Sequence, residues 1–392
     1  MKKIPIVALC GFLGSGKTTL LRRWRRDGAL NDAAFIVHDL SDQGIDANLV
    51  SANEKTHQAG SLVGRVAALH GQHSNKYLHQ SLGSALNGIS ELNPFLVLSE
   101  STGAARPWPL IKALTQDSRY SLRHFIVTVD ALNLHRDFKD GRQLAQGPTT
   151  SKDAALSLAA KILAEQIAFA SVIVLTKIDT VSESAVEAQV RYLRQLQPHA
   201  TIALSAQAGL LLPQLEGVEP PNLIALSNKA KQLGLTEQTS ITEKIEAVVF
   251  RDPRPFHPQR LHEVCQNKLG TGLYRTKGFL WLASRPDHSL LWQQSGSQIS
   301  LELIGLWRAE LVKNLDDKLL PEEVEHLEYM LQSKHQVFGD RFNELTVIGI
   351  ETDRKAFLTA LRDALCTPEE IINWQQGEPF PDPWPKSLRR SP

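Results

Sequence analysis

The segment 4–19, IPIVALCGFLGSGKTT, constrains the fold of this chain more than any other. An apolar run, typical of a buried strand, leads into the turn GFLGSGKT and then into helix-forming residues. The turn, residues 11–18, fits the phosphate-loop pattern G-x-x-x-x-G-K-[ST], and strand, loop and helix follow one another in the order that this pattern requires. The alternative is a chance match in a glycine-rich loop. The segment predicts a nucleotide-binding α/β domain.

The residue types in this turn suit a phosphate group. Glycines allow successive backbone N–H groups to converge on an anion, and the helix that begins near Lys17 adds its positive end. We expect Lys17 to reach the β- and γ-phosphates and the Thr18 hydroxyl to coordinate Mg²⁺. The predicted nucleotide-binding residues of the loop are Gly11, Gly14, Ser15, Gly16, Lys17, Thr18 and Thr19.

Composition excludes several classes of protein. The 392 residues suffice for two or three domains, and a net charge of +1 with 22% charged residues predicts neither a nucleic-acid nor a membrane partner. No apolar run reaches 18 residues, so we expect no transmembrane span, and the basic start MKK is read as the lead into the first strand rather than a signal peptide. Three widely spaced cysteines, Cys10, Cys265 and Cys366, favour a cytoplasmic protein without a disulfide framework.

Two segments downstream of the loop carry acidic residues. The strand candidate FLVLS (95–99) ends at Glu100, a place suited to holding Mg²⁺ or orienting an attacking water, and Gly103 leaves backbone room near the γ-phosphate. The polar segment 38–50 contains Asp46. It is either a switch segment that approaches Mg²⁺ and the γ-phosphate or a surface loop rich in turn residues, and both interpretations remain open.

A guanine-selective site is predicted further on. The strand candidate 171–175 runs into TKID (176–179), a form of the TKxD motif. Asp179 would accept hydrogen bonds from guanine N1–H and the 2-amino group, which adenine cannot offer, and Lys177 would pack over the base. The next strand candidate, 201–204, ends where a backbone N–H can contact guanine O6. The predicted base-binding residues are Thr176, Lys177, Asp179, Ser205 and Ala206.

Four histidines lie between residues 54 and 93, a stretch without cysteine. His70 and His73 are three positions apart and could present ligands for a transition metal, such as Zn²⁺, on one helix face. Histidines are also common on half-exposed helices, so the metal site and the ordinary helix both remain open.

The order of elements predicts an α/β P-loop fold with a doubly wound, mostly parallel sheet, followed by a smaller α+β domain. We expect the first domain over residues 1–206 and a linker over 207–243, where Gly209, Gly217, Pro220 and Pro221 punctuate a polar run. The second domain is expected over 244–392, with short antiparallel strands, bracketing helices and five of the seven tryptophans.

Several ordered motifs resemble the CobW-like GTPases, a family of metal-handling P-loop proteins. GFLGSGKTTLL (11–21), HDLSDQGIDANLV (38–50), ESTGAARP (100–107) and QIAFASVIVLTKIDTV (166–181) are similar to that family's motifs, and the second half resembles its C-terminal domain. The resemblance covers essentially the whole chain. It implies GTP or GDP with Mg²⁺, and a client metalloprotein contacted through the C-terminal domain.

One departure concerns the family's GCxCC metal motif. The matching place reads Gly60-Ser61-Leu62-Val63-Gly64, so each cysteine is replaced, and serine or valine cannot act as a thiolate ligand. Smaller departures are His38-Asp39 where the family has Asn-Glu, and Thr176 for the more usual Asn.

The leading hypothesis is a GTP-binding protein with slow Mg²⁺-dependent hydrolysis, acting as a zinc or cobalt chaperone or insertase-like switch. Its expected catalytic residues are Lys17, Glu100 and Asp46, and its expected Mg²⁺ ligands are Thr18, Glu100 and Asp46. The alternative is a nucleotide-gated regulatory module without metal cargo. A small-molecule kinase is a third hypothesis, against which the TKxD element weighs.

Overall fold

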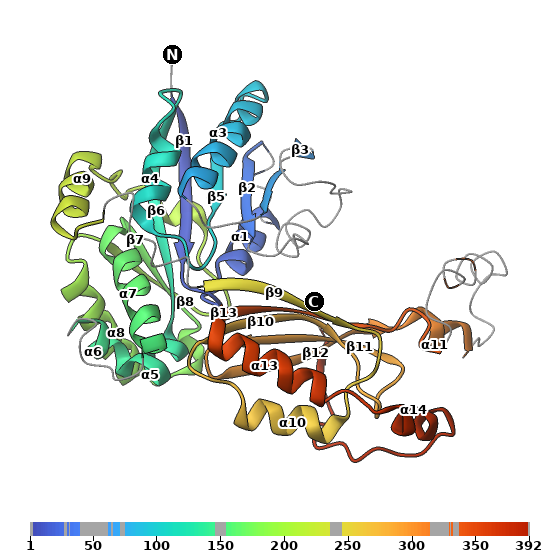
Figure 1. Ribbon diagram of the computed structural model, residues 1–392. Coiled ribbons are helices and arrows are strands. Elements are labelled where there is room, and N and C mark those ends of the chain that lie inside the picture. The colour runs from blue at the N-terminus through green and yellow to red at the C-terminus, as the bar shows by residue number, and fades with distance from the viewer. Residues whose placement is uncertain are drawn as a thin grey trace. The chain divides into compact units, whose positions relative to one another are not determined.

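The computed structural model of the chain describes residues 3–26, 30, 32–39, 62–63, 66–70, 75–145, 154–235, 245–313, 329, 331 and 337–390. It divides into two compact units, Met1–Ile245 and Glu246–Pro392, and each unit has its own sheet (Figure 1). Within the described residues, no helix combines the length and the apolar character that a membrane crossing requires.

The first unit is built on an eight-stranded sheet of order β3-β4-β2-β5-β1-β6-β7-β8, in which all strands except β3 run parallel. Its strands are β1 (Ile4–Gly11), β2 (Ala34–Asp39), β3 (Leu62–Val63), β4 (Val66–His70), β5 (Val97–Glu100), β6 (Tyr120–Asp130), β7 (Val172–Thr176) and β8 (Thr201–Ser205). This arrangement confirms the predicted doubly wound parallel sheet.

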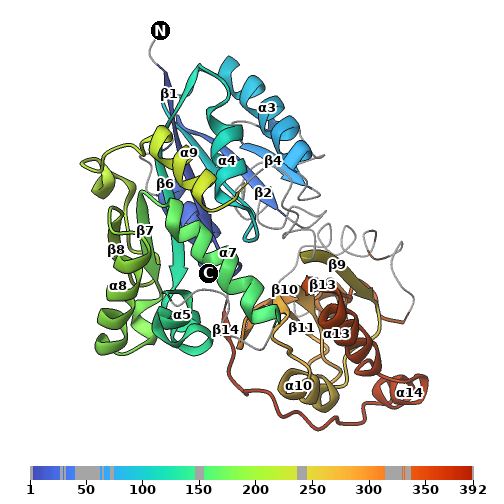
Figure 2. The same ribbon diagram turned by 60° about the vertical axis from the view of Figure 1, so that its left-hand side comes forward.

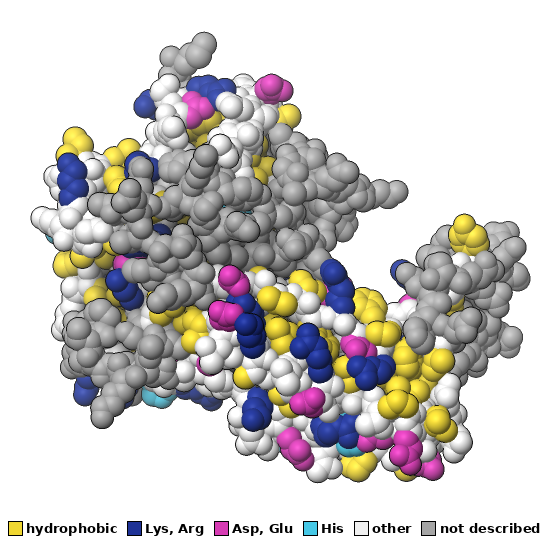
Figure 3. Space-filling model, in the orientation of Figure 1, with side chains coloured by type: hydrophobic (Ala, Val, Ile, Leu, Met, Phe, Trp, Pro, Cys, Tyr) yellow, Lys and Arg dark blue, Asp and Glu magenta, His cyan; other side chains and the backbone are white. Residues whose placement is uncertain are grey.

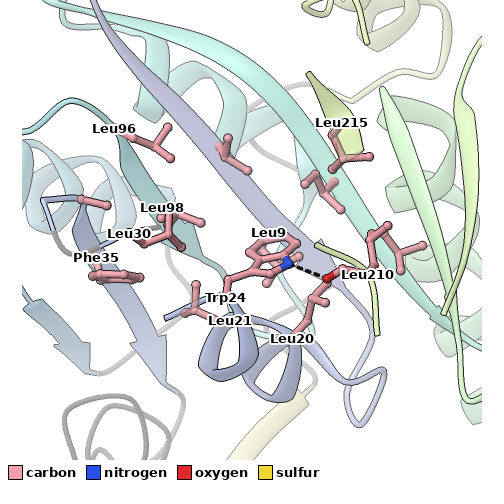
Figure 4. Packing of buried hydrophobic residues seen from close by; sticks show 14 of the residues in the cluster. Leu9, Leu20, Leu21, Trp24, Leu30, Phe35, Leu96, Leu98, Leu210 and Leu215 are labelled. Carbon is pink, nitrogen blue, oxygen red and sulfur yellow. Dashed lines mark hydrogen bonds between the residues drawn. The ribbon is translucent and has the colours of Figure 1, made fainter. Parts of the chain in front are cut away.

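Helices cover both faces of this sheet. Its helices are α1 (Lys17–Arg26), α3 (Asn75–Glu91), α4 (Pro107–Thr115), α5 (Ala131–Phe138), α6 (Arg142–Ala145), α7 (Ala154–Phe169), α8 (Glu183–Leu196) and α9 (Leu223–Gln232), with 3₁₀ turns η1 (Lys139–Gly141), η3 (Ile178–Thr180) and η4 (Leu212–Leu215). Strand side chains alternate between the faces, so Val7 and Leu9 meet the Leu20 and Trp24 side of α1 (Figure 4). Helices α4 and α7 contact each other and β6 (Figure 2).

The expected linker, 207–243, differs from what the structure shows. Leu210 and Leu215 belong to the buried cluster beside α1, and the Trp24 Nε1–H donates to the Leu210 carbonyl oxygen at 2.8 Å (Figure 4). Helix α9 follows, and its Lys229 donates to the Ala168 carbonyl oxygen at 2.7 Å. Glycine and proline punctuate this stretch, but its leucines bury apolar surface, so residues 207–235 are folded as part of the first unit.

The second unit is a six-stranded sheet of order β14-β12-β11-β10-β13-β9, with antiparallel pairing of β10 to β11 and β13 and of β11 to β12. Its elements are β9 (Ile245–Asp252), α10 (Pro258–Asn267), β10 (Leu273–Leu280), β11 (His288–Ser295), β12 (Gln298–Leu306), α11 (Arg308–Lys313), β13 (Asn343–Ile350), α13 (Glu351–Asp363), α14 (Pro368–Gln375) and β14 (Arg389–Arg390). Helices α10 and α13 lie on one face of the sheet (Figure 1). The predicted α+β second half is confirmed.

Aromatic residues give the second unit a separate small cluster. Trp281, Trp307 and Phe338 are buried together, and Trp374 packs against them. The buried guanidinium of Arg341 lies 5.7 Å from the Trp281 ring centroid, a cation–π distance. On the face shown in Figure 3, basic, acidic and apolar side chains are interspersed over the second unit.

Replacing Trp24 by Phe tests how far the 207–235 stretch stabilises the first unit. Trp24→Phe keeps an aromatic ring but removes the N–H donor of the buried Leu210 carbonyl group. We expect the free energy of unfolding to fall by about 1–3 kcal/mol, measured by urea unfolding followed by circular dichroism. Ile224→Ala, at a residue 76% exposed, should change it by no more than about 0.5 kcal/mol. Equal stability of Trp24→Phe and the wild type would contradict this role.

Candidate nucleotide-binding site

The predicted site residues lie at or after the carboxyl ends of four strands, β5, β1, β7 and β8, which together with β6 are neighbours in the sheet. The phosphate loop follows β1, Glu100 ends β5, TKID begins at the end of β7, and Ser205 ends β8. In open parallel sheets ligands bind at this edge, where the loops after neighbouring strands converge. The fold therefore brings together motifs that lie up to 190 residues apart, from Ser15 to Ser205.

The loop between β1 and α1 has the backbone of an anion cradle. Gly11, Gly14 and Gly16 have φ values of +142°, +78° and +91°, which residues with a side chain rarely adopt. The side chain of Lys17 is buried, and its ammonium group donates to the carbonyl oxygens of Gly11 at 2.8 Å and Phe12 at 3.2 Å. The cation is therefore held at the cradle beside the N-terminus of α1, an arrangement that fits a polyphosphate.

Two hydroxyl groups attach the loop to the neighbouring strands. Ser15 Oγ lies 2.6 Å from Thr128 Oγ1 on β6, and Thr176 Oγ1 on β7 lies 2.9 Å from the Ser15 carbonyl oxygen, which accepts its hydrogen bond. A Cβ atom at Gly11 would lie 2.4 Å from the Thr128 carbonyl oxygen, so only glycine allows β1 and β6 this approach. Thr176 replaces the usual Asn of the motif and still connects β7 to the phosphate loop.

Thr18 and Glu100 form the candidate Mg²⁺ site. The Thr18 hydroxyl donates to Glu100 Oε1 at 2.6 Å, and Glu100 is 3% exposed. Hydroxyl and carboxylate oxygens are the hard donors that Mg²⁺ prefers, and it commonly takes only one or two protein ligands together with substrate phosphates. These two side chains fit such an ion.

The loop that follows Glu100 is supported from two sides. A Cβ atom at Gly103 would lie 2.6 Å from the backbone and side chain of Leu13, so this loop lies directly on the phosphate loop. On its other side, Gln166 of α7 donates from Nε2 to the carbonyl oxygens of Gly103 at 3.2 Å and Ala105 at 2.9 Å. Gln166 is fully buried.

An ion pair strengthens the same connection. Arg106, the N-cap residue of α4, donates from Nε and Nη2 to the two carboxylate oxygens of Glu165, at 3.1 and 3.2 Å. Both side chains are at least nine-tenths buried. Sequence reasoning missed Arg106, Glu165 and Gln166, because nothing in their types or spacing indicates that α7 crosses beside the Glu100–Ala105 loop.

The residues predicted to bind the base lie at the ends of β7 and β8. Lys177, whose φ of 56° lies in the left-handed region, pairs with Asp130 at the end of β6. Asp130 also accepts hydrogen bonds from the N–H groups of Leu132 and Asn133, so it fixes both Lys177 and the start of α5. Asp179 is exposed, and the Ser205 hydroxyl is buried without a hydrogen-bond partner in the described part of the chain. These groups leave polar side chains available for a base.

The remaining predicted residues are Asp46, His70 and His73. Asp46 and His73 lie outside the described residues. The helix that was to carry His70 and His73 on one face is wrong, because His70 is the last residue of strand β4, paired in parallel with β2. Leu62 and Val63 of the altered GCxCC segment form β3, which pairs with β4. The described residues contain no group of three His, Cys, Asp or Glu side chains arranged to hold a metal ion.

The three cysteines are free thiols, and Cys10 and Cys366 are buried. Burial raises the pKa of the Cys10 thiol, and burial raises the pKa of both Cys265 and Cys366 to about 12. In the absence of a metal ion these thiols are therefore protonated at neutral pH.

Comparison with known proteins follows the same division into two units. Residues 5–203 match the model of the CobW/HypB/UreG nucleotide-binding domain, and residues 245–365 match that of the cobalamin synthesis protein CobW C-terminal domain. Zinc-regulated GTPase metalloprotein activator 1 of Dictyostelium discoideum is 26% identical over 95% of this chain and 82% of its own length. A zinc chaperone of Mycobacterium tuberculosis is 28% identical over 57% of this chain and 54% of its own length.

The solved structures are more distant. The zinc-bound YjiA GTPase of Escherichia coli is 20% identical, with 93% of this chain and 100% of that chain covered and a TM-score of 0.38. HypB of Helicobacter pylori in complex with nickel is 15% identical, with 60% and 90% covered and a TM-score of 0.34. The family assignment therefore rests on the two domain models and on the order of the site motifs. This chain belongs to the CobW/HypB/UreG family of P-loop proteins and carries the CobW C-terminal domain.

Proposed function

We propose that this protein binds GTP and hydrolyses it slowly in the presence of Mg²⁺, and that the nucleotide state switches a role in metal homeostasis. The observation that carries the proposal is the buried Lys17 ammonium group held at a cradle of three glycines, with the Thr18–Glu100 pair beside it. Relatives named as a zinc-regulated GTPase metalloprotein activator and a zinc chaperone support zinc as the metal. A client metalloprotein would be contacted through the second unit.

The hydrolysis of GTP needs positioning and charge stabilisation more than covalent chemistry. Lys17 and the N–H groups of residues 14–18 would hold the β- and γ-phosphates, and the bound Mg²⁺, kept by Thr18 and Glu100, would neutralise their charge. Glu100 would also orient the attacking water, together with Asp46, and the Gly103 N–H would face the γ-phosphate. Asp179, supported by Lys177, would select guanine, with the backbone of Ser205 and Ala206 at its O6.

The pairing of Arg106 supports slow turnover. The arginine nearest in sequence to Gly103 is Arg106, and both its Nε and its Nη2 bind the buried Glu165 carboxylate. The pair holds the Arg106 guanidinium on Glu165, and an arginine that stabilises the transferred phosphoryl group is worth roughly 10³–10⁵ in rate. A partner protein that supplies an arginine would accelerate the reaction.

Lys17→Ala tests the phosphate loop. Loss of the ammonium group should weaken GTP binding by about 100-fold or more, because a buried charge partner of the phosphates is removed. Calorimetric titration with Mg²⁺·GTP measures the change. Lys231→Ala, at an exposed position of α9, is the matched control and should bind as the wild type does. Unchanged affinity in Lys17→Ala would contradict the assignment of this loop.

Gln166→Leu tests the connection between α7 and the Gly103 loop. The variant removes the donor to two carbonyl groups of that loop but leaves the phosphate loop intact. We expect kcat for GTP to fall by about tenfold, with GTP affinity changed less than about twofold, because misplaced groups affect the transition state most. Single-turnover hydrolysis and calorimetry measure the two quantities.

The matched control is Gln197→Leu. Gln197 bridges two carbonyl groups in the same manner, those of Ala168 and Ala170, but away from the Gly103 loop. The Gln197→Leu variant should lose about as much free energy of unfolding as Gln166→Leu, but its kcat should be unchanged. Equal effects of both variants on kcat would mean that Gln166 acts only through stability.

A second candidate function is a nucleotide-gated regulatory module without metal cargo. The specific observation in its favour is the replacement of the family's three motif cysteines by Ser61, Val63 and Gly64. Phosphate release measured with and without Zn²⁺ or Co²⁺ separates the two functions. Stimulation by either ion supports the metal-homeostasis role, and an identical rate in all three conditions supports the regulatory module.

A further inference from the structure

A cavity lies at the amino ends of strands in the first sheet, opposite the edge that carries the candidate nucleotide site. It has a volume of about 570 Å³ and is lined at the amino ends of β1 and β6 by residues such as Pro5, Val7 and Leu122. Strand β1 runs from this cavity to the phosphate loop. Pro5 and Gly11 are six positions apart on the strand, which corresponds to about 20 Å. The cavity therefore belongs to neither the phosphate loop nor the base-binding motifs.

The interior of this cavity is mostly apolar. Its lining includes Trp24, Leu30 and Leu96, which are labelled in Figure 4, and Leu212 and Pro213. Phe95, also in the lining, is 52% exposed. Pockets of about 300–1,000 Å³ with apolar walls and a few polar groups are typical of small-molecule sites.

The one buried polar side chain of the lining is an imidazole. His124 is 3% exposed, and its Nδ1 atom has no hydrogen-bond partner within the described residues. Burial, with a smaller contribution from Arg123, lowers the pKa of His124 to about 4, so the ring is neutral at pH 7. A neutral imidazole carries one N–H donor and one acceptor nitrogen, so the unpartnered Nδ1 can donate to a ligand in the tautomer that carries the proton there.

The charged side chains of the lining are two cations and one anion. Lys3 and Arg123 are exposed, and Arg123 Nη2 donates to the backbone carbonyl oxygen of Glu216 at 3.0 Å. The Glu216 carboxylate is the single acidic group of the lining, and Ser121 adds a hydroxyl. Most polar groups of the lining are therefore hydrogen-bond donors, and their net charge is +1. A ligand that accepts hydrogen bonds and carries a negative charge would complement them.

We propose that this cavity binds a small amphiphilic carboxylate, whose apolar body lies against Trp24 and Leu96 and whose anionic group meets Lys3 and Arg123. The His124 imidazole contributes one further donor to that group. The site is independent of the proposed nucleotide binding, so saturating Mg²⁺·GTP leaves it available.

The test uses two probes on the full chain, the fluorescent sulfonate 1-anilinonaphthalene-8-sulfonate and decanoate. We expect decanoate to displace one equivalent of the fluorescent probe, and the uncharged decan-1-ol to displace it at least tenfold more weakly. The double variant Lys3→Gln, Arg123→Gln should remove this preference for the anion. Equal displacement by the acid and the alcohol, or an unchanged preference in the double variant, would overturn the anionic part of the proposal.

Location is tested by filling the cavity. Leu212→Trp adds bulk to its wall, whereas Leu211→Trp, at a neighbouring residue that does not line it, is the matched control. Decanoate affinity should fall at least tenfold in Leu212→Trp only. Pro213→Trp, at an exposed lining position, repeats the test if Leu212→Trp has a lowered melting temperature. Wild-type affinity in a folded Leu212→Trp or Pro213→Trp variant would show that the probes bind elsewhere and would overturn the proposal.

Discussion

The attachment of the phosphate loop to two neighbouring strands is the constraint on which the rest of the site depends. Ser15 contacts the hydroxyl of Thr128 on β6, and the Thr176 hydroxyl reaches the Ser15 carbonyl group from β7. At Gly11 the backbones of β1 and β6 lie so close that a side chain would not fit between them. Thr176 begins the TKID segment. Its hydroxyl therefore connects the phosphate loop directly to the segment predicted to bind the base.

A second attachment connects the loop after Glu100 to α7. Gln166 and the Arg106–Glu165 pair hold its backbone in a buried environment, where hydrogen bonds and ion pairs are costly to break. A change of nucleotide that moved Gly103 would therefore have to move α7 as well or break these contacts.

The sheet, the phosphate loop and the order of the motifs could be predicted from the sequence, because each depends on local residue patterns. The support from Gln166 and Arg106 could not, since it depends on where α7 crosses the sheet. The linker expected over 207–243 was misread for a similar reason: Leu210 and Leu215 are buried only because α1 presents Trp24 to them. The helical reading of His70 failed because parallel pairing with β2 decides its conformation.

The altered GCxCC segment carries none of the motif's thiolate ligands, so a metal site in this chain would need other ligands. For the proposed nucleotide site, the structure describes Lys17, Thr18, Glu100 and Asp179. The most direct test of the central claim is competition of GTP, ATP and XTP for the Mg²⁺-loaded wild type and for Asp179→Asn. The account predicts that the wild type prefers GTP over ATP by at least about 100-fold and that Asp179→Asn prefers XTP, because an amide in place of the carboxylate donates to the 2-oxo group of xanthine. Equal affinity of the wild type for GTP and ATP would contradict guanine recognition by Asp179.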